Sequence, residues 1–197
     1  MSYRPLFIEA LRQVERAGRL AAAKGGHHPV IIVGGSAVEL STAGNIISGD
    51  IDICEGDEAL EEALLDVGFL RETRAGRLLR GYYMVTPDGE FGVELVSDPL
   101  FDNRSDRQRL QLFAIDDAGQ RVLAIPPIED LIADRLAQYE ANPSGHDDML
   151  EQARIMVELA DNLDSAYLKR RVVEECLDGE AVLQALREPS FAERTSG

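Results

Sequence analysis

A short apolar run followed by two glycines and a serine constrains the fold of this chain more than any other feature. Residues Val30–Val33 are all apolar and β-branched, which is typical of a strand buried on both faces. Gly34 and Gly35 allow a tight turn because they carry no Cβ atom. Ser36 is a favoured helix N-cap, and Ala37–Leu40 is typical of a first helical turn. The segment therefore predicts a strand, a turn and a helix within an α/β protein.

Two aspartates follow on a second predicted strand. Residues Asp50–Cys54 alternate polar and apolar side chains, the period-two pattern of a strand with one acidic face. Asp50 and Asp52 lie two residues apart and so point to the same face. Neighbouring carboxylates resist ionising together unless a cation lies between them, and hard divalent ions such as Mg²⁺ prefer oxygen ligands. An isolated pair of this kind also occurs as the solvated face of an edge strand.

The spacing of these two features favours a site that binds metal and phosphate. Thirteen residues separate Ser36 from Asp50, which leaves room for a helix and a loop between the strands. Glycine lets the backbone approach a phosphate closely, and the N–H groups at a helix start bind anions. Gly34, Gly35 and Ser36 are therefore predicted to bind phosphate. Asp50 and Asp52 are predicted to bind the metal.

The rest of the chain predicts an α/β part followed by a helical part. Before residue 126, the side-chain pattern predicts helices at 6–23 and 58–67. It predicts strands at 77–85, 91–96, 110–115 and 121–125. The Thr86–Gly89 segment contains Pro-Asp-Gly and predicts a hairpin turn. Further helices are predicted at 129–139, 148–160, 165–176 and 180–186. The Pro126-Pro127 step marks the boundary, and it predicts three parts of the chain, 1–125, 126–190 and a tail at 191–197.

The net charge of the chain limits the partners that it can bind without a compensating positive charge. The 197 residues carry a formal net charge of −16, which repels polyphosphates, RNA and acidic membranes. A nucleotide site would therefore need metal ions or a local basic cluster. Such a cluster occurs at Arg71, Arg74, Arg77 and Arg80. It would receive phosphates or, alternatively, balance acidic side chains on a solvated strand pair.

The sequence predicts a cytoplasmic protein without a membrane partner. Its N-terminus lacks a long apolar segment, and no apolar run approaches the roughly 20 residues that span a bilayer. Cys54 and Cys176 have no metal-ligand spacing and are expected to be free, buried thiols in a reducing compartment.

The motifs described above resemble the signature of the nucleotidyltransferase superfamily, an apolar strand with Gly-Gly or Gly-Ser, a short helix and then Asp-x-Asp. The resemblance covers roughly residues 28–175 and implies an α/β (α+β) fold, a mixed sheet flanked by helices with a helical C-terminal part. It implies Mg²⁺, or Mn²⁺, held by Asp50, Asp52 and a third carboxylate on a later apolar strand. Glu94 occupies that position, and Glu90 competes with it for the same role.

The helical part resembles a narrower group, the small bacterial nucleotidyltransferase-like proteins of AbiEii toxin-like and uncharacterised type. Those proteins continue after the sheet with a proline, an acidic residue, a helix that usually bears lysine, and an Asp-x-x-Asp helix. This chain has Arg135 at the lysine position and Glu151 in place of the second aspartate. A guanidinium can clamp a phosphate with two hydrogen bonds, so Arg135 is predicted to bind phosphate.

The resulting prediction is a Mg²⁺-dependent nucleotidyltransferase that moves NMP from an NTP to an acceptor and releases pyrophosphate. RNA such as tRNA, a protein and a small molecule are all open as acceptors. The alternative hypothesis is an inactive scaffold of the same fold that binds a nucleotide or a protein. Membership of a toxin–antitoxin pair is a further hypothesis, about physiology.

Overall fold

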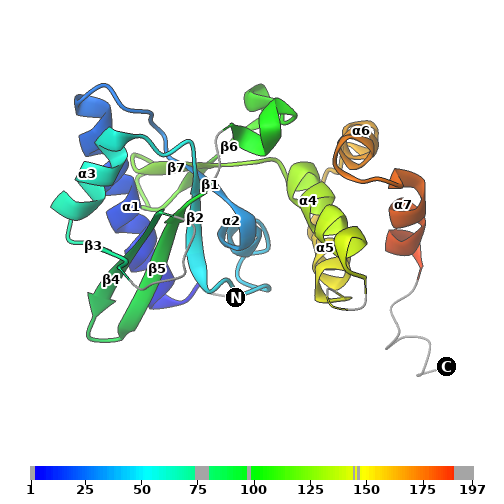
Figure 1. Cartoon of the computed structure of the whole chain (residues 1–197), viewed down its shortest axis with the longest axis horizontal. Coiled ribbons are helices and arrows are strands. Elements are labelled where there is room, and N and C mark those ends of the chain that lie inside the picture. Colours follow the sequence, from blue (N-terminus) through cyan, green and yellow to red (C-terminus); the bar gives the residue numbers. More distant parts are fainter. Residues whose placement is uncertain (1–2, 74–79, 97–98, 144, 146, 189–197) are drawn as a thin grey trace. The chain divides into compact units, whose positions relative to one another are not determined.

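The predicted buried strand lies within a seven-stranded mixed sheet in the computed structural model of the chain (Figure 1). The structure describes residues 3–73, 80–96, 99–143, 145 and 147–188. Contacts divide the chain into unit 1, Met1–Pro126, and unit 2, Pro127–Gly197. The sheet belongs to unit 1, and the described part of unit 2 is helical. The α/β class predicted from the sequence is confirmed.

Unit 1 alternates helices and strands along the chain. Its helices and strands are α1 (Pro5–Ala23), β1 (Ile31–Val33), α2 (Gly34–Ser41), β2 (Asp50–Cys54), α3 (Glu58–Asp66), β3 (Leu70–Arg71), β4 (Arg80–Thr86), β5 (Gly89–Leu95), η1 (Leu100–Asn103), η2 (Arg107–Arg109), β6 (Gln111–Ala114) and β7 (Val122–Ile125). The strand order is β3-β4-β5-β2-β1-β7-β6. β1 pairs antiparallel with β2 and parallel with β7, whereas β2 pairs parallel with β5. The predicted hairpin is confirmed as the antiparallel pair β4–β5, which turns at Pro87 and Asp88.

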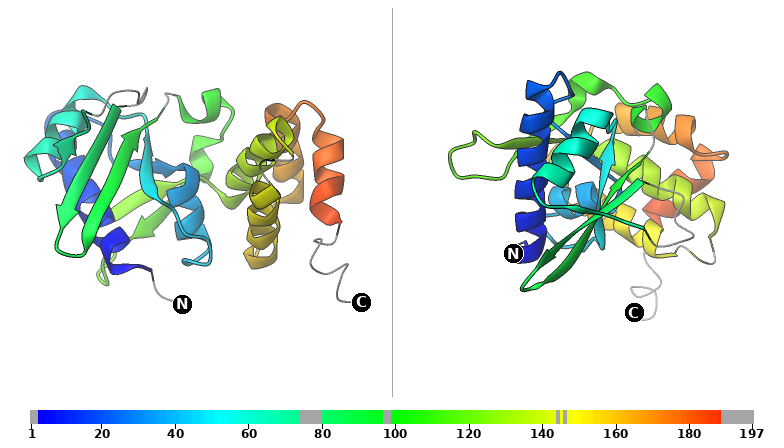
Figure 2. Two further views of the ribbon diagram at one scale, coloured as in Figure 1. Left: turned by 60° about the horizontal axis from the view of Figure 1, so that its bottom comes forward. Right: turned by 60° about the vertical axis from the view of Figure 1, so that its left-hand side comes forward.

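One face of the sheet is covered by helices. Ile51 and Ile53 of β2 point to this face with Val93 of β5, and all three are fully buried. Phe7 of α1 packs against Phe91 of β5, with 5.8 Å between the ring centroids. α3 lies alongside α1 on the same side (Figure 2). The residues of β2 that alternate with these isoleucines, including both predicted site aspartates, point to the opposite face.

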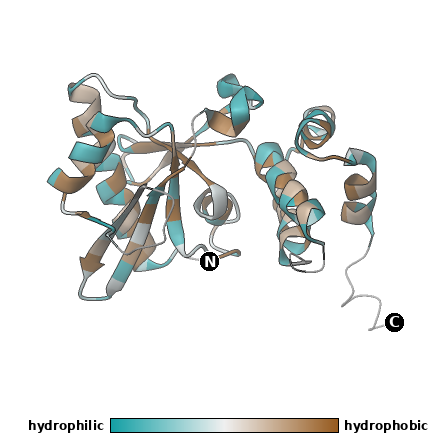
Figure 3. Ribbon diagram, in the orientation of Figure 1, coloured by the Kyte–Doolittle hydropathy of each residue, from teal (hydrophilic) through white to brown (hydrophobic). Residues whose placement is uncertain are grey.

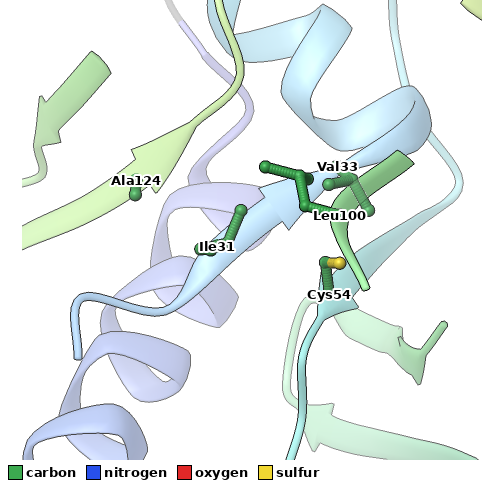
Figure 4. Packing of buried hydrophobic residues seen from close by; sticks show 5 residues of the cluster. All are labelled: Ile31, Val33, Cys54, Leu100 and Ala124. Carbon is green, nitrogen blue, oxygen red and sulfur yellow. The ribbon is translucent and has the colours of Figure 1, made fainter. Parts of the chain in front are cut away.

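A small apolar cluster lies on that opposite face. Its members come from β1, β2, β7 and η1, and they are Ile31, Val33, Cys54, Leu100 and Ala124 (Figure 4). The cluster fixes β1 against its neighbours up to the point where Gly34 begins the next helix. The site described below therefore starts from a buried, packed strand.

Unit 2 contains the helices α4 (Ile128–Ala141), α5 (Asp147–Leu159), α6 (Ser165–Glu175) and α7 (Gly179–Arg187). These helices carry both hydrophobic and hydrophilic residues (Figure 3). Arg171 of α6 donates a hydrogen bond to Asp130 of α4, and both side chains are fully buried. Tyr167 also donates to Asp130, at 3.1 Å. Within the described ranges of the chain, no helix has the length and apolar character needed to cross a membrane.

Candidate active site

The turn at the end of β1 lies directly against Asp52. The strand register pairs Val33 with Asp52, so Gly34 follows beside the aspartate. Gly34 has a φ of +60°, and a Cβ atom there would lie 2.2 Å from Asp52 Oδ2. Both the left-handed backbone and this contact require glycine. The predicted phosphate-binding turn and the predicted metal ligand are therefore neighbours.

Ser36 joins the same turn to β2, but it does not cap a helix. α2 begins at Gly34 with Val33 as its N-cap, so the predicted N-cap role of Ser36 is wrong. Ser36 lies within the first turn of α2, two residues after the left-handed Gly34. The fully buried Ser36 Oγ donates to the Val33 carbonyl at 2.9 Å and accepts from the Asp52 N–H at 3.2 Å. Its side chain thereby holds Asp52 in position.

Asp50, Asp52 and Glu94 lie on one face of the sheet. In the parallel pair of β2 and β5, Asp52 is partnered by Glu94 and Asp50 by Gly92. Paired residues of adjacent strands point to the same face, so all three carboxylates emerge there. A Cβ atom on Gly92 would lie only 3.3 Å from Asp50 Cβ. Gly92 therefore leaves space on β5 beside Asp50.

These carboxylates supply the oxygen ligands that Mg²⁺ prefers. Within the described part of the chain, no three His, Cys, Asp or Glu side chains are already grouped to hold a metal ion. Mg²⁺ is usually held by one or two carboxylates together with water and substrate phosphates, so Asp52 with Asp50 or Glu94 fits such an ion. The competing Glu90 is exposed and pairs with Val85 before β5 reaches β2, so the register favours Glu94.

A partly buried ion pair contacts the loop that leads into Asp50. Glu39 of α2 is 1% exposed and accepts a hydrogen bond from the Ser48 N–H at 2.7 Å. Arg4 Nη2 donates to Glu39 Oε2 and to the Ser48 carbonyl, each at 2.6 Å. Ser48 Oγ in turn donates to the Asp50 carbonyl at 2.6 Å. The sequence did not predict these contacts, because Arg4 lies 35 residues from Glu39 and 44 from Ser48.

A cavity of about 130 Å³ lies at the other end of β1 and β2. Its lining includes the side chains of His27, His28, Glu55, Asp57 and Arg107. Arg107 forms two hydrogen bonds with Glu55, which lower the pKa of that carboxyl, and Asp57 is the N-cap of α3. Both carboxylates are thus engaged in contacts that support the fold. No predicted site residue lines this cavity, so the acidic face beside Gly34 is the candidate active site.

The predicted phosphate ligand Arg135 belongs to α4 of unit 2. Its side chain is buried, with Nη1 3.3 Å from Asp134 Oδ2. Burial raises the pKa of Asp134, and the Arg135 cation opposes that rise. Part of the Arg135 charge is therefore balanced within α4. Phosphate binding by Arg135 stays a prediction.

The predicted basic cluster is described only in part. Arg71 lies 3.4 Å from Glu61 and 5.8 Å from the centre of the Tyr82 ring. Arg74 and Arg77 lie outside the described residues. The contacts of Arg71 favour the hypothesis that it balances acidic side chains.

Solved structures share the fold of this chain. No protein-family model matches the sequence, and no match is found among curated proteins. An antigenic nucleotidyltransferase-like protein from Paracoccidioides brasiliensis aligns with a TM-score of 0.60 and 15% identity, over 94% of each chain. ANT(2")-Ia in complex with adenylyl-2"-tobramycin aligns with a TM-score of 0.50 and 16% identity, over 91% of this chain and 97% of the other.

The solution structure of the antibiotic-resistance factor ANT(2'')-Ia aligns with a TM-score of 0.50 and 15% identity, over 96% of this chain and 98% of the other. At these identities the similarity is one of fold. The mixed sheet of unit 1 and its helices are thus consistent with a nucleotidyltransferase-like fold. The AbiEii toxin-like subgroup stays a prediction from the sequence.

Proposed function

We propose that this chain is a metal-dependent nucleotidyltransferase, which transfers NMP from an NTP to an acceptor hydroxyl and releases pyrophosphate. The observation that carries the proposal is the contact between the Gly34 turn and Asp52, which is itself paired with Glu94. A turn able to receive phosphate thus lies beside carboxylates able to hold a divalent cation. The nucleotidyltransferase-like fold supports the same class of reaction.

The start of α2 is the proposed site for the outer phosphates. The first N–H groups of a helix have no partner within the helix, and they carry the positive end of its dipole. The backbone N–H group of Gly35, next to the fully buried Ser36, is therefore the proposed donor to phosphate oxygens. Gly34 and Gly35 keep side chains out of the space that a phosphate needs. Phosphate binding by Arg135 is proposed from the sequence alone, independently of the start of α2.

Asp50, Asp52 and Glu94 are the proposed metal ligands. A divalent ion held by these carboxylates would supply positive charge toward the phosphate oxygens of an in-line displacement. Ser36 orients Asp52 through its hydrogen bond with the backbone N–H. The pairing of β2 with β5 keeps Glu94 at the level of Asp52.

In the proposed transfer, the acceptor oxygen attacks the α-phosphorus while the bond to the bridging oxygen breaks. Pyrophosphate leaves with the electron pair of that bond, and the hydroxyl proton passes to one of the three carboxylates. The protein forms no covalent bond with the substrate. Its contribution is to position the reactants and to stabilise the charge that develops.

Transfer of a label from the NTP to an acceptor tests this proposal. Each NTP, labelled at the α-phosphate, is incubated with the protein, Mg²⁺ or Mn²⁺, and one acceptor at a time. Because the ANT(2")-Ia complex contains adenylyl-2"-tobramycin, tobramycin is the first small molecule to test, beside tRNA and a protein pool. Pyrophosphate release is measured in parallel. We expect transfer by the wild type and its loss in the Asp50→Asn, Asp52→Asn double variant.

The matched control is Glu90→Gln, which neutralises an exposed carboxylate on β5 that lies outside the β2–β5 pairing. It should keep the transfer rate of the wild type. If the wild type releases no more pyrophosphate than the double variant with any acceptor, the transferase proposal is wrong. NTP binding in that case, measured by calorimetry, would support the scaffold hypothesis.

A further inference from the structure

We propose that Glu39 is a positioning residue for Asp50 and Asp52, acting with Arg4 through Ser48. This inference rests on the proposed function, because it concerns the strand that carries the proposed metal ligands. Glu39 touches neither carboxylate in the contacts described above. It acts on the backbone from which they extend.

α2 holds the start of β2 at two points. Near its first residue, Ser36 Oγ accepts the hydrogen bond from the Asp52 N–H. One turn later, Glu39 accepts the hydrogen bond from the Ser48 N–H. These two contacts lie on either side of Asp50 along the chain. The backbone of Asp50 is also held directly, because Ser48 Oγ donates to its carbonyl.

Glu39 can fulfil this role because its charge is compensated where it is buried. A buried carboxylate is costly unless it is paired and hydrogen-bonded. Arg4 supplies the pairing, donating from Nε to Glu39 Oε1 at 3.2 Å and from Nη2 to Oε2 at 2.6 Å. The Arg4 guanidinium lies over two aromatic rings, 5.5 Å from the centre of Phe7 and 5.6 Å from that of Phe91. The ion pair therefore connects α1, α2 and the loop before β2.

The loop between α2 and β2 is held by two separate sets of contacts. Thr42 holds its first half, since the Thr42 carbonyl accepts from Asn45 Nδ2 at 2.6 Å and Thr42 Oγ1 accepts from the Ile46 N–H at 3.2 Å. Glu39 and Arg4 hold the second half, at Ser48. Removing the Glu39 charge should therefore loosen the segment next to Asp50 while the first half stays in place.

Glu39→Gln tests the inference, because it keeps the size of the side chain and removes its charge. Amide hydrogen exchange measures the backbone, and Mn²⁺ titration followed by electron paramagnetic resonance measures the site. We expect the Ser48 and Asp52 amides to exchange at least about tenfold faster, with α1 unchanged, because the opening is local. We expect Mn²⁺ affinity to fall by about 10- to 100-fold, as for other residues that orient metal ligands.

The matched control is Glu15→Gln. Glu15 is another fully buried carboxylate of unit 1, and it pairs with Arg19 within α1, at 2.7 Å. This variant should leave the exchange of Ser48 and Asp52 and the affinity for Mn²⁺ as in the wild type. Ser48→Ala is a milder second variant, since it removes only the hydroxyl contact with the Asp50 carbonyl. Ser48→Ala should also speed amide exchange and lower the affinity for Mn²⁺, each by a smaller factor than Glu39→Gln.

The outcomes separate this inference from the proposed function. If the wild type binds no Mn²⁺, or binds it no more tightly than Asp52→Asn, the proposed metal site is wrong, and the inference fails with it. If the wild type binds Mn²⁺ through Asp52 but Glu39→Gln retains the affinity of the wild type, only the positioning role is overturned. Equal acceleration of amide exchange throughout unit 1 would also overturn it, because that result indicates a general loss of stability.

Discussion

At the scale of single residues, Gly34 has the most restricted position in the candidate site. Its φ of +60° lies in the left-handed region, which side chains with a Cβ atom rarely adopt. In addition, a Cβ atom would overlap Asp52 Oδ2, at 2.2 Å. Two independent physical reasons therefore exclude other residues, and only the second concerns the active site. A comparison of two glycines can separate them.

Gly34→Ala should lower the free energy of unfolding by about 2–4 kcal/mol, because it combines left-handed strain with displacement of the Asp52 carboxylate. Gly119→Ala is the matched control. Gly119 has a similar φ of +64°, but a Cβ atom there would meet nothing within 4 Å. Gly119→Ala should therefore lower the free energy of unfolding through backbone strain alone, by about 1–2 kcal/mol. Urea denaturation measures both, and equal losses would show that Asp52 moves aside freely.

At the scale of helices and strands, the sequence predicted most elements, including the three-residue β1, and missed those that lack a local pattern. The helix at 6–23 and the hairpin around Pro87 and Asp88 match α1 and β4–β5, because periodicity extends over many residues and the turn has a strong signal. β3 was missed, because two exposed residues cannot show an alternation. The turn within η1 was missed as well, since Phe101 and Asp102 adopt positive φ without glycine.

The candidate site could be predicted only where its signal is local. The spacing of Gly34 and Asp52 is visible in the sequence, and their contact follows from the antiparallel pairing of β1 with β2. The position of Glu94 depends on the register of β5 against β2, which no local pattern fixes. The contact of Arg4 with Glu39 joins residues that lie 35 positions apart, so no local pattern indicates it. Such contacts can be identified only from the tertiary structure.

The helices of unit 2 provide a test of buried charge. Arg171 pairs with Asp130, whose side chain is fully buried, and with Glu174, whose side chain is 32% exposed. Removing one partner of a buried ion pair leaves the other charge buried and uncompensated. Asp130→Ala should therefore lower the free energy of unfolding by about 3–5 kcal/mol. Glu174→Ala should lower it by less, because Arg171 keeps Asp130 and Glu175 as partners. Similar losses in urea denaturation would contradict this account.

At the scale of the whole molecule, the fold and the charge constrain function in different ways. The fold is shared over 94% of each chain with a nucleotidyltransferase-like protein at only 15% identity, so a similar fold forms although most residues differ. A fold accommodates many functions, so the function depends on the site. The net charge of −16 is unfavourable for any triphosphate. A nucleotide can therefore bind beside Asp50 and Asp52 only if a cation compensates the negative charges of the triphosphate and of the carboxylates.

Removal of the metal tests that balance. At constant ionic strength, chelation should weaken ATP binding to the wild type by at least about tenfold, because Asp50 and Asp52 then repel the triphosphate directly. The Asp50→Asn, Asp52→Asn variant should behave in the opposite way. It should bind ATP more weakly than the wild type with Mg²⁺, and more strongly with chelator, since two negative charges are gone. Calorimetry at both conditions measures the four affinities, with Glu90→Gln expected to follow the wild type. If chelation does not reverse the order of the two ATP affinities, the two aspartates do not face the phosphates. The charge of the chain must then be compensated elsewhere.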